Sequence, residues 1–132
     1  MSQEREGERE TVLVSACLLG TPCNHEGGHK RNAAVEALGA THRVIPICPE
    51  VCGGLSTPRP AAERQGDRVV NVDGDDVTTA YERGARAAVE LAHAVDARRA
   101  VLKARSPSCG SGGTTTEALR AVGIEVESEE DL

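Results

Sequence analysis

Arg43-Val44-Ile45-Pro46-Ile47-Cys48-Pro49-Glu50 joins a short apolar run to a cysteine and a carboxylate. The run is predicted to be a short buried strand, because the apolar residues stop abruptly where proline and glycine begin. Residues 51–60 contain two glycines and two prolines, a composition typical of a constrained loop. The stretch therefore presents the thiol of Cys48 and the carboxylate of Glu50 at the end of a strand.

Apolar runs and helix-like periods alternate along the rest of the chain. Residues 11–16, 42–47, 99–104 and 123–127 are predicted strands, and residues 32–38, 77–94 and 114–121 are predicted helices. A small hairpin is predicted across residues 63–71, with its turn at Gly66-Asp67. Strands that alternate with helices form parallel sheets with right-handed crossovers. The sequence therefore predicts an α/β fold, a single Rossmann-like domain with a parallel sheet flanked by helices and a small hairpin.

Two of the predicted helices carry start signals. Asp75-Asp76 precedes the helix over residues 77–94 and is predicted to cap it rather than to form a catalytic pair. Thr114 and Glu117 have the spacing of a capping box at the start of the last helix.

Composition limits the classes of partner. The chain has 132 residues, 39% of them apolar, which suits one domain over residues 11–132 after a disordered charged tail over residues 1–10. It has no Phe or Trp and one Tyr, so the core is predicted to be aliphatic and cannot stack single-stranded nucleic acid on aromatic rings. A net charge of −6 argues against nucleic acid or an anionic membrane as a partner. No stretch has the apolar length of a signal peptide core or a membrane span, so a cytoplasmic location is expected.

Three of the five cysteines follow predicted strands. Cys17, Cys48 and Cys109 each lie on a loop just past a strand end, beside proline or glycine. In an open parallel sheet the ligand crevice lies beyond the carboxyl ends of the strands, so these thiols are expected to converge. Three thiolates suit zinc with a fourth ligand, or an iron-sulfur cluster with one open iron. The spacing has neither the close pairs of zinc ribbons nor the compact run of ferredoxins, which favours chemistry at an open metal site.

Other side chains on these loops have two interpretations each. Cys23 and Cys52 are predicted to be structural thiols rather than ligands, and His25 and His29 to be polar residues of a surface loop rather than zinc ligands. Glu50 suits an acid/base role or a solvated carboxylate equally on spacing alone. Ser106 and Ser108 are expected to bind substrate or to fix the turn around Pro107. Arg59 and Arg105 are expected to be solvated.

Three motifs resemble, in their order along the chain, the signatures of the thiouracil desulfurase family. They are Val14-Ser15-Ala16-Cys17-Leu18-Leu19-Gly20 with Pro22-Cys23, Pro46-Ile47-Cys48-Pro49-Glu50-Val51 with Gly53-Gly54-Leu55 and Thr57-Pro58-Arg59-Pro60, and Leu102-Lys103 with Arg105-Ser106-Pro107-Ser108-Cys109-Gly110. The resemblance covers residues 11 to about 127. It implies a Rossmann-like domain that carries a 4Fe-4S cluster on Cys17, Cys48 and Cys109. The acid/base carboxylate and the serine of the family correspond to Glu50 and Ser106.

The resemblance also implies a reaction, the non-redox removal of sulfur from a thiolated pyrimidine such as 2-thiouracil, giving uracil and sulfide. The open iron takes the sulfur, Glu50 activates a water, and Ser106 orients the base or the water. The expected partners are the thiolated nucleobase and the iron-sulfur assembly machinery.

Two alternatives stay open. One is an iron-sulfur or persulfide carrier without hydrolytic activity, which the extra Cys52 and a segment after Gly113 that is shorter than in the family favour. The other is a small zinc-stabilised domain that uses Cys17, Cys23, Cys109 and a histidine.

Overall fold

The computed structural model describes residues 9–132. The sequence predicts a disordered tail over residues 1–10. Residues 1–8 of it lie outside the described residues, so for them this stays a prediction. The backbone of Glu10 already belongs to the fold, because its carbonyl accepts a hydrogen bond of 2.9 Å from the Arg43 amide.

Four parallel strands form the central sheet. They are β1 (Thr11–Ser15), β2 (Arg43–Ile47), β5 (Arg99–Leu102) and β6 (Glu125–Ser128), in the spatial order β2-β1-β5-β6. Every residue of β1 is buried, as expected for an inner strand of a sheet that is covered on both faces. The predicted parallel sheet is confirmed, and the carboxyl ends of all four strands point to the same edge.

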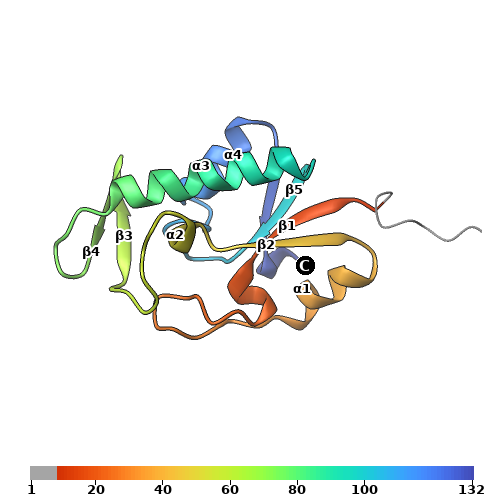
Figure 1. The fold of residues 1–132 in the computed structure, drawn as a ribbon, viewed down its shortest axis with the longest axis horizontal. Coiled ribbons are helices and arrows are strands. Elements are labelled where there is room, and N and C mark those ends of the chain that lie inside the picture. The colour runs from red at the N-terminus through yellow and green to blue at the C-terminus, as the bar shows by residue number, and fades with distance from the viewer. Residues whose placement is uncertain (1–8) are drawn as a thin grey trace, which may run out of the picture.

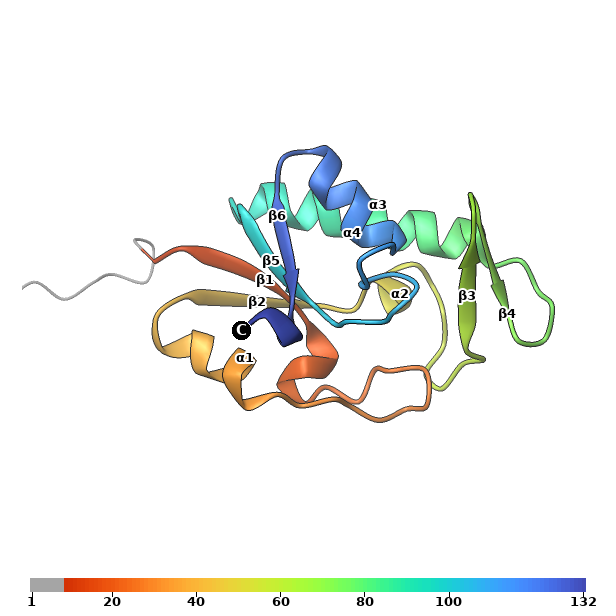
Figure 2. The same ribbon diagram turned by 180° about the vertical axis from the view of Figure 1, so that it is seen from behind.

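Helices cover the two faces of the sheet unequally. Figures 1 and 2 show α3 (Thr78–Ala94) and α4 (Thr114–Ala121) on one face and α1 (Ala33–Ala37) on the other. Two clusters of buried apolar residues lie between the sheet and these helices. The larger contains Leu13, Ile47, Ala88, Ala92, Ala97, Ala100, Leu102, Cys109, Leu119 and Ile124, and the smaller contains Val12, Val14, Leu18, Val35 and Val101. Successive residues of β1 point to opposite faces of the sheet and therefore belong to different clusters. The predicted aliphatic core is confirmed.

Short elements gather at the carboxyl edge of the sheet. The predicted hairpin is formed by β3 (Ala62–Gln65) and β4 (Arg68–Asn71), which stand beyond the strand ends in Figure 1. A single-turn helix, α2 (Pro49–Cys52), follows β2, and turns of 3-10 helix follow β1 and β6 at Ala16–Leu19 (η2) and Glu129–Asp131 (η4). A third 3-10 turn, Leu38–Ala40 (η3), follows α1 and leads into β2 at the opposite edge.

The residues after Cys48 differ from the prediction, which placed a loop there. Pro49 begins α2, because the fixed φ of proline suits the first helical position and its missing N–H has no partner to lose there. The turn is completed by hydrogen bonds from the Cys52 amide to the Cys48 carbonyl and from the Gly53 amide to the Pro49 carbonyl.

α2 and α3 touch through their backbones at two glycines. A Cβ atom on Gly53 would lie 2.0 Å from the carbonyl oxygen of Ala80, and one on Gly84 would lie 2.0 Å from that of Pro49. No side chain fits at either position. Glycine here lets the helix that carries Glu50 lie directly against α3.

The two predicted helix caps have opposite outcomes. Val77 is the N-cap of α3 and its side chain caps nothing, but the Asp76 carboxylate one residue earlier accepts a hydrogen bond of 2.9 Å from the Thr78 amide, so the capping prediction holds for Asp76 alone. The predicted capping box of Thr114 and Glu117 is wrong, because Gly113 is the N-cap of α4 and no side chain caps it. Carbonyl groups of the preceding loop, at Pro107 and Ser108, take the first amides of α4 instead.

Candidate active site

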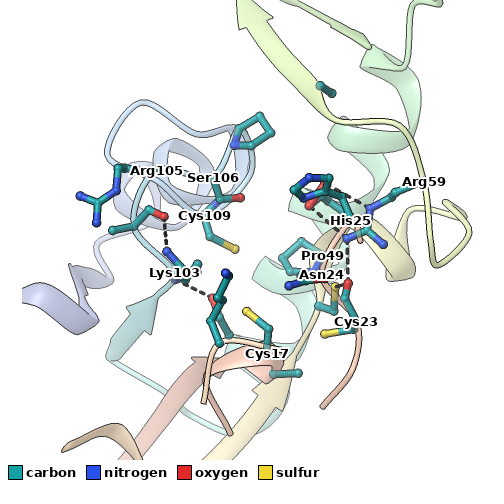
Figure 3. A pocket seen from close by; sticks show the side chains of 18 of the residues that line it. Cys17, Cys23, Asn24, His25, Pro49, Arg59, Lys103, Arg105, Ser106 and Cys109 are labelled. Carbon is teal, nitrogen blue, oxygen red and sulfur yellow. Dashed lines mark hydrogen bonds and ion pairs between the residues drawn. The ribbon is translucent and has the colours of Figure 1, made fainter. Parts of the chain in front are cut away.

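The ends of β1, β2 and β5 open onto one cavity of about 320 Å³. Cys17, Cys48 and Cys109 all line it, although they are far apart in the sequence. Figure 3 shows the sulfur atoms of Cys17 and Cys109 directed into the space between Lys103 on one side and Arg59 on the other. The structure therefore brings together the three thiols that the sequence singles out.

Hydrogen bonds to backbone and side-chain atoms hold each of the three cysteines. The carbonyl of Cys17 accepts from the amides of Gly20 and Lys30, which fixes η2 against the following loop. Cys48 is the N-cap of α2, and its thiol donates over 3.6 Å to the carbonyl of Cys23. The Cys109 amide donates to Ser106 Oγ over 3.1 Å. The three thiols are thus carried on ordered turns.

Burial raises the pKa of most of these thiols. It raises the pKa of Cys109 to about 12, although hydrogen bonds from the hydroxyls of Ser15 and Ser108 act in the opposite direction. Burial, and next the neighbouring Cys48, raise the pKa of Cys17 and Cys23, that of Cys23 to about 12. In the metal-free protein these thiols are protonated at neutral pH, and a metal centre must displace their protons.

The described side chains form no compact site for a single metal ion. Within residues 9–132, no group of three or more His, Cys, Asp and Glu side chains is close enough to hold one metal ion. The alternative zinc site of Cys17, Cys23, Cys109 and a histidine is therefore not formed by the described side chains. A four-iron cluster is larger than an ion, so the thiolates that hold it stand farther apart.

The Glu50 carboxylate forms part of the cavity wall and is held by two donors. The hydroxyl of Tyr81, on α3, donates to Oε2 of Glu50. Nη2 of Arg59 donates to Oε1 over 3.3 Å, and the two side chains are 4% and 15% exposed, so this is a buried ion pair. Burial raises the pKa of Tyr81 far above its usual value, and the neighbouring Glu50 raises it further, so the phenol remains a donor.

Ser106 lies on the opposite wall of the cavity, close to Cys109 in Figure 3. Its Oγ accepts hydrogen bonds from the amides of Ser108 and Cys109, at 3.2 and 3.1 Å. The two lone pairs of the hydroxyl are thereby used, which leaves its O–H as a donor. Ser106 therefore fixes the turn, and its binding of substrate stays a prediction.

Lys103 also lines the cavity, and the last turn of the described chain contacts this side chain. Lys103 Nζ lies 3.2 Å from Oε2 of Glu129, and the amide of Ala104 donates to Oε1 over 2.7 Å. Glu129 belongs to η4, so the last turn of the described chain packs onto the loop that leads to Cys109.

Several expectations about individual residues are corrected by the structure. Arg59 is buried rather than solvated, because its guanidinium also donates to the carbonyl of Cys23 over 2.8 Å. Cys52 is exposed rather than packed, and it borders a separate surface hollow that Cys23 and Cys48 also line. Cys23 is buried, as expected of a structural thiol, and it also lines the cavity.

The remaining predicted candidates divide between the cavity and the surface. Arg105 lines the rim and is exposed as expected, with Glu130 as its partner. His25 lines the cavity, and His29 does not line it. Tyr81, whose hydroxyl contacts Glu50, is a cavity neighbour that the sequence pattern did not single out. The one available signal was its being the sole tyrosine of a chain without Phe or Trp.

Comparisons with known proteins agree on one family. Residues 12–131 match the family model of 2-thiouracil desulfurase. A protein of Bacillus subtilis (strain 168), named uncharacterized protein YbbK, is 34% identical over 146 aligned positions that cover 92% of this chain and 97% of that protein. A solved structure of a [4Fe-4S]-dependent thiouracil desulfidase, TudS, is 47% identical, with a TM-score of 0.88 and coverage of 94% of this chain and 93% of that one.

Proposed function

Because the chain belongs to the 2-thiouracil desulfurase family, we propose that its cavity binds a thiolated pyrimidine resembling 2-thiouracil and replaces the sulfur by oxygen. The chain is a sulfur-removing enzyme of the general kind that the family defines. One observation carries the proposal for the substrate and the site. Three thiols and one buried carboxylate face a single cavity at the carboxyl edge of the sheet.

The cofactor of this enzyme is a 4Fe-4S cluster, as in the 47% identical thiouracil desulfidase. We propose Cys17, Cys48 and Cys109 as its ligands. The donor set suits the cluster, since the three side chains supply soft sulfur ligands and leave one iron without a protein ligand. That iron, when the cluster is bound, supplies a Lewis acid with high affinity for the sulfur of a thiocarbonyl group.

The side chains of the chain itself supply the proton transfers. Thiouracil and water give uracil and hydrogen sulfide with no change in electron count, so the reaction needs proton transfer and no reductant. Glu50 is the base that takes a proton from the attacking water, because its carboxylate faces the cavity and is held in place by Tyr81 and Arg59. Ser106 donates its hydroxyl hydrogen to the base or the water from the opposite wall.

The cellular setting follows from the same features. All five cysteines are free thiols, which suits the reducing cytoplasm that we propose as the location. We also propose that iron-sulfur assembly machinery supplies the cluster. Within residues 9–132, no helix has both the length and the apolar character to cross a membrane.

The experiment that tests this function uses protein reconstituted with iron and sulfide without oxygen. We expect iron and acid-labile sulfide in near-equal amounts, a brown chromophore, and release of sulfide and uracil from 2-thiouracil. Alanine variants of Cys17, Cys48 and Cys109 should each lose the chromophore, and Cys52→Ala, which changes an exposed thiol outside the cavity, should keep it.

Two results contradict the proposal. A loaded protein that accepts sulfur but never releases uracil is a sulfur carrier, the alternative that the exposed Cys52 favours. Stoichiometric zinc with no cluster after reconstitution points to a structural metal domain instead.

A further inference from the structure

We propose that Tyr81 and Arg59 are positioning residues, which together hold the Glu50 carboxylate so that its Oε1 atom alone is left to take a proton from water in the cavity. The inference rests on the proposed function, and it assigns to two side chains on other elements a share in the activity of Glu50. Tyr81 lies on α3 and Arg59 on the loop between α2 and β3, so neither lies at the strand ends where the proposed cysteine ligands stand.

Tyr81 fixes one oxygen of the carboxylate. Its side chain is 2% exposed, and its hydroxyl donates to Oε2 of Glu50 from the first turn of α3. A buried tyrosine hydroxyl needs a partner, and Glu50 is the partner that the structure provides. Burial raises the pKa of the phenol, so Tyr81 is protonated and can donate at neutral pH.

Arg59 fixes the other oxygen and ties three segments together. Its Nη2 donates to Oε1 of Glu50 over 3.3 Å and to the carbonyl of Cys23 over 2.8 Å. Its Nη1 donates to the carbonyl of Ser56 and to the hydroxyl of Thr57. Three of the five acceptors of the guanidinium lie outside Glu50, so its position is set by the loops rather than by Glu50 alone.

The donors leave the two carboxylate oxygens unequal. An ionised carboxylate has about four lone-pair positions, two on each oxygen. Oε2 accepts from Tyr81 and, over 3.5 Å, from Nε of Arg59. Within residues 9–132, Oε1 accepts only from Nη2 of Arg59, so one of its lone pairs is open to a water in the cavity.

Packing of α2 against α3 makes this arrangement rigid. The two glycine contacts, at Gly53 and Gly84, bring the backbones together on either side of the Glu50–Tyr81 pair. A base held in one orientation loses little freedom when the water binds, which is how positioning contributes to catalysis.

The first experiment is a double-mutant cycle on the cluster-loaded enzyme with 2-thiouracil. We expect Tyr81→Phe to lower kcat roughly 10- to 100-fold, with KM changed less than about 2-fold and iron content unchanged, because the base is misplaced while the pocket is intact. In a Glu50→Gln background the same substitution should cause no further loss, since it acts through Glu50. Arg59→Lys should lower kcat in the same way as Tyr81→Phe, because lysine keeps the positive charge but lacks the several N–H donors of the planar guanidinium.

Two control variants separate positioning from stability. Thr78→Val removes an acceptor of the Val69 amide from the same helix, away from the cavity, and should lower the unfolding midpoint while kcat stays unchanged. Arg68→Lys alters an exposed pair with Asp76 and should change neither quantity.

The second experiment needs no cluster and no substrate. Tyr81 is the only tyrosine and the chain has no tryptophan, so the emission of the metal-free protein reports this one phenol. A carboxylate that accepts the hydrogen bond of an excited phenol quenches its emission. We expect Glu50→Gln to raise the tyrosine emission of the folded metal-free protein, and Cys52→Ala, on the same α2 turn, to leave it unchanged.

The outcomes are distinguishable from failure of the proposed function. Should the wild-type protein release no sulfide, the emission still tests whether Tyr81 donates to Glu50. Equal emission from wild type and Glu50→Gln overturns the inference, and so does a Tyr81→Phe enzyme with wild-type kcat. An equal loss of kcat from Tyr81→Phe with and without Glu50 also overturns it. If Tyr81→Phe does not fold, Arg59→Lys and the emission measurement decide.

Discussion

At the scale of single residues, the proposed cluster ligands and the proposed base lie on different elements. The cysteines lie at strand ends, whereas the Glu50 carboxylate lies one residue inside α2 and receives its partners from α3 and from the loop after α2. The two proposed roles can therefore be removed independently by substitution. A change at Glu50 should leave cluster binding intact.

Glu50→Gln tests this separation. Glutamine has the shape of glutamate but cannot take a proton from water, so kcat should fall on the order of 10²- to 10⁴-fold. The iron content and the visible spectrum should match wild type, because no cysteine is altered. Steady-state release of uracil, measured beside iron and sulfide analysis, checks both parts. A Glu50→Gln enzyme with full kcat contradicts the role of Glu50 as base.

The sequence pattern predicted the meeting of the three cysteines correctly, but it did not predict the contacts of the residues around them. Cysteine placement after apolar runs depends on local sequence, and that signal located Cys17, Cys48 and Cys109. Burial of Arg59 depends on Glu50 and on the carbonyl of Cys23, which is 36 residues away in the chain. No local pattern encodes such a contact.

At the scale of elements, the approach of α2 to α3 decides where Glu50 lies. Gly84→Ala tests this contact. Alanine is favoured over glycine inside a helix by about 1 kcal/mol, yet the added Cβ would lie 2.0 Å from the Pro49 carbonyl oxygen. Overpacking of this kind costs about 1–3 kcal/mol, so we expect a lower free energy of unfolding in urea and a lower kcat.

The matched control for this contact is Gly39→Ala. No atom lies within 4 Å of a Cβ built on Gly39, so the substitution should leave the free energy of unfolding unchanged or slightly higher. Equal effects of the two substitutions would show that α2 does not depend on the contact with Gly84.

The start of α3 gives a pH-dependent contribution to stability. Hydrogen bonds from the side chain and the amide of Thr78, and then from Arg68, lower the pKa of Asp76 from its ordinary value of 3.8 to about 2. A carboxylate whose pKa is lower in the folded state stabilises the fold when ionised. Its contribution is complete above about pH 4 and is lost as the pH falls towards 2.

We therefore expect Asp76→Asn to lower the urea midpoint at pH 6 and to have a smaller effect near pH 2. Urea titrations of both proteins across this range measure the difference. Asp75→Asn is the matched control, because no hydrogen bond or ion pair of the Asp75 side chain is found within residues 9–132. A constant difference between wild type and Asp76→Asn from pH 6 to pH 2 would contradict the assignment.

The helices and strands with a long or regular apolar pattern were predicted correctly, and the short ones without such a pattern were not. Apolar runs located the strands, and a repeated apolar face located α3. α2 was missed because a four-residue helix that starts at proline and ends at glycine has the composition of a loop. The cap of α4 was predicted wrongly because carbonyls of the loop before it, and not the Thr114 side chain, accept hydrogen bonds from its first amides.

At the scale of the whole molecule, the parallel arrangement of the strands brings distant parts of the sequence together at one edge of the sheet. Strands β2, β1 and β5 are neighbours in the sheet, so three cysteines separated along the chain meet at one edge. The last residues return to that edge after β6 and pack against the loop that leads to Cys109. The end of the described chain therefore supports one loop of the site.

Glu129→Ala tests this dependence. The substitution removes the acceptor of the buried Ala104 amide and the partner of Lys103, whose side chain is 23% exposed. A buried donor without a partner costs roughly 1–3 kcal/mol, which we expect as a lower free energy of unfolding. Loosening of the loop to Cys109 should also speed the loss of iron to a chelator. Glu130→Ala is the matched control, because Glu130 pairs with Arg105 at the surface and should change stability by less than about 0.5 kcal/mol. Identical unfolding and iron loss in the two variants would mean that the chain end does not support the cluster loop.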